Sequence, residues 1–232
     1  FSINGNRFTG ALPSVVEGQP YGVVVGNKWQ RSPDGQLIIN PATGIPNGTD
    51  AGMVIADPNR DYIAGLTNSF KYKAFSFSVL VDYKQGGDIV SWGAIALRNN
   101  GSLEETGVDR DQPRIFPGVI KTADGKFVPN NIQIPAQTYW QAMGQTSGAG
   151  DLGVFDATVM RLREVTFSYD IPVRRFISRA RVTLFGRNLF YYAPNSPFDT
   201  EINHQGAGNL RGLELQSNPN VRNMGVSLKL TF

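Results

Sequence analysis

The chain has 232 residues, of which 41% are hydrophobic and 11% aromatic, and it carries a formal net charge of +3 with no cysteine. The lack of cysteine excludes disulfides, thiolate metal sites and cysteine nucleophiles, and so small a charge does not predict a nucleic-acid partner. No apolar run approaches the roughly 18 residues of a membrane-spanning helix, so only short, half-apolar strands could cross a membrane.

Strand candidates recur as segments in which apolar and polar residues alternate, the period-two pattern of a strand with one apolar face. The clearest is Phe75–Tyr83, where every odd-numbered residue is apolar or aromatic. Together they predict an all-β fold with about six antiparallel strands. In chain order the predicted strands are Phe1–Phe8 (weakly marked), Tyr62–Tyr72, Phe75–Tyr83, Val159–Tyr169, Arg179–Tyr192 and Asn220–Phe232.

The final predicted strand ends the chain on an aromatic residue of its apolar face, Phe232. Apolar residues toward lipid, polar residues toward the lumen and an aromatic residue at the interface are typical of a transmembrane barrel strand. We therefore expect lipid to contact the apolar faces of this strand and of Phe75–Tyr83. The predicted lipid-facing residues are Phe75, Phe77, Val79, Val81, Tyr83, Val226, Leu228 and Leu230.

The connections between these strands alternate in length. Lys73-Ala74 and the segment from Asp170 to Ser178 are short, whereas residues 9–61, 86–154 and 193–219 form long connections. Short turns at one end and long loops at the other are the layout of an outer-membrane barrel, with the long loops outside the cell. This parity places Phe232 at the short-turn, periplasmic end.

Two places conflict with an uninterrupted strand. Arg161 and Arg163 share parity with apolar neighbours, and Asn188 does so in the next strand. A charge aimed at lipid near the bilayer midplane costs roughly 2–4 kcal/mol. We therefore expect a β-bulge or an early exit from the membrane at both places, with Gly186 as the bulge site in the second.

The longest connection carries three aromatic residues, Trp92, Tyr139 and Trp140, which are candidates for contact with a substrate or partner. The alternative is that they form a small core within the connection. Basic residues also gather around the short turn after Asp170, where they would contact lipid phosphates or simply be solvated. These are Arg174, Arg175, Arg179 and Arg181.

Motifs for catalysis are weak. Gly148–Gly153 matches G-x-G-x-x-G, but no strand precedes it and a strand rather than a helix follows. His204 is the single histidine and lies in a polar loop, and the acidic pair Glu104-Glu105 lacks a partner across a cleft. No catalytic residue, metal site or cofactor is predicted.

Six blocks, in order and spanning nearly the whole chain, resemble the C-terminal region of the SusC/RagA family of TonB-dependent outer-membrane transporters of Bacteroidetes. They are Gly18–Gly22, Asp57–Asn59 followed by Tyr62–Leu66, Tyr83–Asp88, Leu162–Asp170, Gly186–Phe190 and Ser227–Phe232. The resemblance implies a large β-barrel of about 22 strands around an N-terminal plug. Residues 1–232 would supply its last strands, with the plug and earlier strands outside this chain, which begins at Phe1.

The resemblance also implies a function in the bacterial outer membrane: active import of glycans or peptides with a SusD-like lipoprotein, without enzymatic chemistry. The implied partners are that lipoprotein, TonB acting through the plug, membrane lipid, and the barrel-assembly machinery, for which Phe232 would be the signal. Two transporter–lipoprotein pairs could further form a dimer. The residues leave two alternatives open: a soluble, secreted β-sandwich that binds carbohydrate, and a passive porin without a plug.

Overall fold

A computed structural model describes residues 11–144, 150–172, 176–202 and 211–232. The chain divides into two compact units. The strand unit consists of Arg60–Gly86, Asp156–Ile202 and Asn218–Phe232, and the mixed unit consists of the described parts of Phe1–Asn59, Gly87–Phe155 and Asn203–Ser217. Within the described residues, no helix has the length and apolar character needed to cross a membrane.

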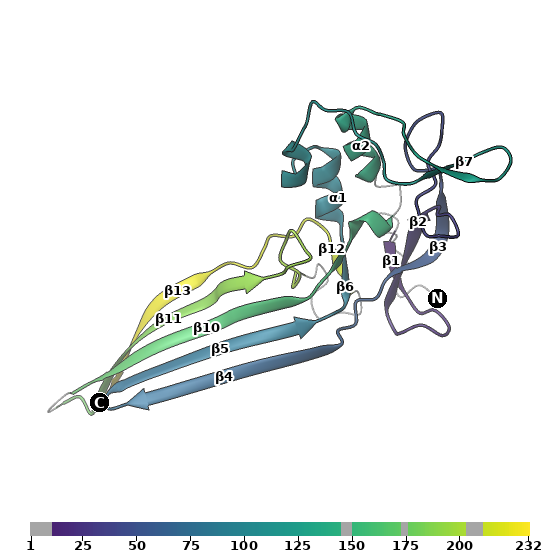
Figure 1. The fold of residues 1–232 in the computed structure, drawn as a ribbon. Coiled ribbons are helices and arrows are strands. Elements are labelled where there is room, and N and C mark those ends of the chain that lie inside the picture. The colour runs from purple at the N-terminus through teal and green to yellow at the C-terminus, as the bar shows by residue number, and fades with distance from the viewer. Residues whose placement is uncertain (1–10, 145–149, 173–175, 203–210) are drawn as a thin grey trace. The chain divides into compact units, whose positions relative to one another are not determined.

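The strand unit is a single antiparallel sheet of five long strands in the order β13-β11-β10-β5-β4 (Figure 1). Each strand pairs with the long strand nearest to it in the sequence, as expected of an up-and-down barrel wall. The bounds are β4 Tyr62–Tyr72, β5 Phe75–Gln85, β10 Val159–Ile171, β11 Arg179–Tyr192 and β13 Asn223–Thr231.

These five strands confirm five of the six predicted from alternation, and the sixth, Phe1–Phe8, lies outside the described residues. The predicted bounds of β4 and β11 are correct, whereas β13 begins at Asn223 rather than Asn220. The β4–β5 hairpin turns through Lys73, which takes the left-handed conformation with φ of 52°. Thr231 pairs with Arg179, so the chain end lies at the short-turn end of the sheet, as predicted.

Bulges occur in both strands where polar residues conflicted with the alternation. In β10 the register shifts between Leu162 and Glu164, which makes Arg163 the extra residue. In β11 the same shift leaves Asn188 and Leu189 opposite Arg163, and Asn188 has a φ of 51°, while Gly186 stays in the ladder opposite Val165. The predicted bulges are therefore confirmed but Gly186 as a bulge site is wrong, because asparagine itself adopts the left-handed conformation readily.

The mixed unit contains shorter elements drawn from the long connections (Figure 1). Its sheets have the orders β1-β2-β3, β12-β6-β9 and β7-β8. The strands are β1 Ala11–Ser14, β2 Val23–Trp29, β3 Thr49–Ala56, β6 Asp88–Ser91, β7 Val119–Lys121, β8 Phe127–Pro129, β9 Val154–Asp156 and β12 Leu213–Glu214. The helices are α1 Trp92–Asn99 and α2 Ala136–Met143, with 3-10 turns η1 Glu104–Gly107 and η2 Gly150–Gly153.

Two small apolar clusters hold the mixed unit together. One joins β1, β2, β3, β6 and β12, and is made of Ala11, Val24, Ile55, Ala56, Val90 and Leu213. The other surrounds α2 and is made of Ile39, Phe116, Ile134 and Ala142. The long connections are therefore folded rather than plain loops.

The start of α1 is fixed by a buried acid from a remote segment. The Ser91 hydroxyl caps the helix by accepting from the Ala94 N–H at 2.9 Å. The Glu214 carboxylate accepts from the same hydroxyl at 2.6 Å and from the Gly93 N–H at 2.9 Å. Negative charge at a helix N-terminus is favourable, so β12 anchors α1 although more than a hundred residues separate them.

Candidate functional site

One face of the five-stranded sheet is apolar across its whole width. The register sets Phe77 of β5 opposite Phe167 of β10, Phe167 opposite Leu184 of β11, and Leu184 opposite Val226 of β13. All eight residues predicted to contact lipid lie on this face: Phe75, Phe77, Val79, Val81, Tyr83, Val226, Leu228 and Leu230.

This apolar face is bare. Leu66 is 65% exposed and Leu228 is 60% exposed, although both belong to regular strands. Contiguous exposed apolar surface of this kind marks a contact with a membrane or another protein. The strand unit therefore carries an apolar surface that needs an occupant.

Aromatic residues lie at both ends of the apolar face. At one end the rings of Tyr62 and Tyr83 lie 5.9 Å apart, and at the other Phe75 lies 4.8 Å from Tyr169. From Phe75 to Tyr83 the strand measures about 27 Å at roughly 3.4 Å per residue. In a barrel whose strands tilt about 40°, this corresponds to about 21 Å along the membrane normal. That spacing approaches the apolar band of about 25 Å between the aromatic girdles of outer-membrane barrels.

The opposite face is polar and carries cross-strand pairs. Ser69 lies 2.9 Å from Ser78, and Ser168 lies 2.8 Å from Thr183, measured between hydroxyl oxygens. Near the short turn, Arg181 donates to both carboxylate oxygens of Asp170, at 2.6 and 2.7 Å. Such a face suits water and not lipid.

The β10 bulge brings Arg163 onto this polar face beside Arg161. Arg163 Nε donates to the Asp82 carboxylate at 2.8 Å, and its Nη2 donates to Glu201. Arg161 pairs with Asp199, and its Nε lies 2.9 Å from Glu201 Oε2. Both side chains are thus paired with acids on the polar face, so the free-energy cost of a charge aimed at lipid does not arise.

The acids Asp199 and Glu201 belong to the connection after β11, and the ion cluster fixes that connection. The Arg161 and Asp199 side chains are only 2% and 1% exposed. Burial would raise the pKa of Glu201, but hydrogen bonds from Arg163 and Lys84 and the charge of Arg161 outweigh it and lower the pKa. Sequence alternation could not find these acids, because their partners lie in other strands.

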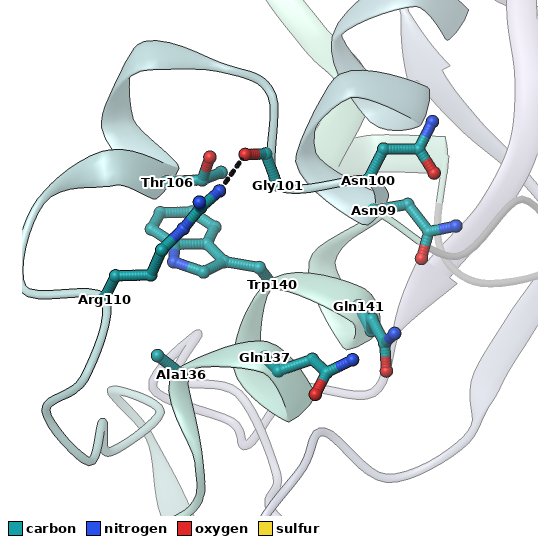
Figure 2. Close-up of a pocket in the computed structure, with 9 residues that line it drawn as sticks. All are labelled: Asn99, Asn100, Gly101, Thr106, Arg110, Ala136, Gln137, Trp140 and Gln141. Carbon is teal, nitrogen blue, oxygen red and sulfur yellow. Dashed lines mark hydrogen bonds between the residues drawn. The ribbon is translucent and has the colours of Figure 1, made fainter.

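The three aromatic candidates of the longest connection have different surroundings. Trp92 is the first residue of α1 and is half-buried. Tyr139 stacks on Phe116 with ring centroids 4.2 Å apart, in the small core around α2. Trp140 is 8% exposed and lines a pocket between α2 and the end of α1 (Figure 2).

The remaining sequence candidates are placed only in part. Arg179 and Arg181 pair with Asp170, while Arg174 and Arg175 lie outside the described residues, as does His204. Gly150–Gly153 forms η2 and the strand β9 follows it, as the sequence predicted. No group of three or more potential metal-binding side chains occurs in the part of the chain that the structure describes.

Comparison with known proteins gives relatives of one kind. TonB-dependent receptor P3 of Formosa agariphila is 24% identical over 209 residues, covering 86% of this chain and 19% of the relative. TonB-dependent receptor P26 of the same organism is 26% identical over 243 residues, covering 98% and 22%. The chain thus spans about a fifth of the length of the curated relatives it matches. No family model matches.

Solved structures agree on the fold. The RagAB peptide importer in its open-open state matches 97% of this chain and 23% of its own, with a TM-score of 0.59 and 18% identity. Its closed-closed state matches with the same TM-score and 17% identity. At this identity the likeness concerns the fold.

Proposed function

We propose that this chain is the C-terminal barrel portion of a SusC/RagA-type TonB-dependent transporter of the bacterial outer membrane. It would form part of the wall of a channel that actively imports glycans or peptides. The observation that carries the proposal is the bare apolar face of the five-stranded sheet, bordered by aromatic residues at both ends. Lipid is the occupant that suits a face of this height and composition.

The polar face of the same sheet then lines the lumen. Hydroxyl pairs and the ion cluster around Arg161 satisfy polar groups that would be costly in lipid. The short-turn end with Phe232 is periplasmic, and the connections at the other end reach the outside. In this arrangement the folded mixed unit is the part that meets the substrate.

The proposed transport needs partners outside this chain. A SusD-like lipoprotein delivers the substrate, and TonB supplies energy through the plug of the complete protein. The barrel-assembly machinery inserts the barrel by pairing with its final strand, whose Phe232 is 84% exposed. No covalent chemistry is assigned to the chain, whose work is binding and passage.

Expression of the full-length gene in strains with and without TonB tests this proposal. The protein should fractionate with the outer membrane, require detergent for extraction and run faster on a gel before heating than after. Uptake of the substrate should stop in the strain without TonB. Uptake that continues there would identify a passive porin, and release by salt alone would favour a soluble β-sandwich, whose apolar face ought to be covered.

A further inference from the structure

The connection that follows β11 folds back against the polar face of the five-stranded sheet. Its residues 195–201, here called the strap, belong to the same compact unit as the five long strands. The Glu201 carboxylate forms ion pairs with Lys84 of β5 and with Arg161 and Arg163 of β10. Because all three cations belong to the polar face, near its long-loop end, the strap packs against that face and not against the apolar one.

The strap also contacts the chain next to the other strands. Thr200 Oγ1 donates to the Ala157 carbonyl, two residues before β10, at 3.0 Å. Asn220, just before β13, donates to Asp199 Oδ2 at 3.1 Å. Ahead of β4, Arg60 Nη2 lies 3.5 Å from the Thr200 carbonyl oxygen. Since the strap continues from β11 and pairs with β5, this one segment contacts the chain at the long-loop end of all five strands.

The strap is packed tightly and is locally stiff. Asp199 and Thr200 are only 2% and 3% exposed, so they lie directly against the wall. Asp199 Oδ1 accepts from the Glu201 N–H at 3.0 Å, which closes a turn within the strap. Pro197 fixes a further backbone angle. A segment held by buried ion pairs and stiffened in this way is a fixed part of the wall and not a freely moving loop.

In the transporter proposed above, the polar face lines the lumen, so the strap stands inside the channel. A layer of chain packed on a sheet lies about 10 Å from it, and the channel is narrower by about that much on this side. We propose that the strap is a fixed constriction that sets an upper size for solutes entering from the long-loop end. The ion cluster that holds the strap pairs three cations with three acids, so the constriction should select by size and not by charge. This proposal rests on the transport function and adds a size limit to it.

Size-graded labelling of a single cysteine beside the strap tests the constriction. Leu80 shares the polar face of β5 with Asp82, lies two residues nearer the short turn, and pairs with Glu164. Leu80→Cys, in a cysteine-free full-length receptor in lipid nanodiscs, is reacted with maleimides that carry polyethylene glycol chains of increasing length. The rate should fall roughly tenfold or more from the shortest reagent to the longest, because restricted passage adds to the barrier. At Val128→Cys, an exposed position of β8, all reagents should react alike.

Glu201→Ala removes the carboxylate that ties the strap to β5 and β10, and should make the rates at Leu80→Cys nearly independent of reagent length. Asp170→Ala is the matched control, because Asp170 also pairs with arginines of the polar face, but at the short-turn end. It should leave the length dependence unchanged. The gel mobility of unheated samples shows whether both variants are folded.

A second measurement tests the position of the strap without disturbing the ion cluster. Ala157→Cys combined with Thr200→Cys should form a disulfide on oxidation, because the Thr200 side chain contacts the Ala157 carbonyl. Failure of this disulfide to form in the folded receptor would overturn the proposal. So would rates at Leu80→Cys that do not depend on reagent length, or a length dependence that persists in folded Glu201→Ala.

Absence of reaction at Leu80→Cys even with the shortest reagent would also overturn the constriction, since no open passage would lie beside the strap. All these results leave the transport function standing. A spin label at Leu80→Cys that is reached by oxygen dissolved in lipid, and not by a water-soluble nickel complex, would instead place the polar face in the membrane. That result would remove the barrel wall itself, and the transport function with it.

Discussion

Removing one member of the ion cluster at the β10 bulge should strongly destabilise the strand unit. Arg161→Met removes the cation that pairs with Asp199 and Glu201, whose side chains are 1% and 9% exposed. Removing one partner of a buried ion pair costs about 3–5 kcal/mol, because Asp199 then stays buried without a cation, whereas Glu201 keeps Arg163 and Lys84. The free energy of unfolding should fall by that amount.

Arg179→Met is the control for this experiment. Arg179 also pairs with an acid, Asp170, but its side chain is 57% exposed and the pair is 3.4 Å long. Exposed pairs contribute about 0–1 kcal/mol. Urea unfolding of the full-length protein in lipid vesicles, monitored by the gel mobility of unheated samples, compares the free energies of unfolding of the two variants. Equal losses in both variants would refute the reasoning, and Asp199→Leu added to Arg161→Met should restore part of the loss.

Three further predictions concern single positions. Deleting Phe232 should lower the amount of inserted receptor more than its synthesis, and equal membrane levels would contradict the assembly role. The pKa of Glu201 is lowered on folding from 4.5, so its stabilising contribution is complete above pH 4.5 and is lost as pH falls through the folded-state pKa. The free energy of unfolding should therefore fall less steeply with decreasing pH in Glu201→Gln, and an unchanged pH dependence would refute this. Gly225→Val should lower the free energy of unfolding by about 1–3 kcal/mol, since a Cβ there would lie 2.6 Å from the Phe185 ring. This loss should shrink when Phe185→Leu is added, and a loss that persists would show that the ring is not its cause.

The strand unit could be predicted from the sequence because the signal for its strands is local. Alternation alone located β4 and β11 correctly, since each strand shows one face to an apolar and one to a polar environment. The same rule identified Arg161 and Arg163 as misfits and so predicted the β10 bulge. It assigned the β11 bulge to Gly186 because glycine is the usual site, whereas Asn188 carries it.

The mixed unit could not be predicted, because its contacts join remote segments. The three-residue strands β7 and β8 are too short for periodicity to show. The parallel pairing of β12 with β6 joins Leu213 to Val90. The pocket likewise depends on the approach of α1 to α2, and the amides that line it carry no pattern in the sequence.

The lipid-facing assignment is the central claim, and spin-label accessibility tests it most directly. This chain contains no cysteine, so single cysteines at Phe77, Val79 and Val81, and at Ser76, Ser78 and Asp82, can be labelled in a cysteine-free full-length receptor in vesicles. Labels at the first three positions should be reached by oxygen dissolved in lipid, and labels at the second three by a water-soluble nickel complex. The same accessibility on both faces would contradict the barrel-wall account.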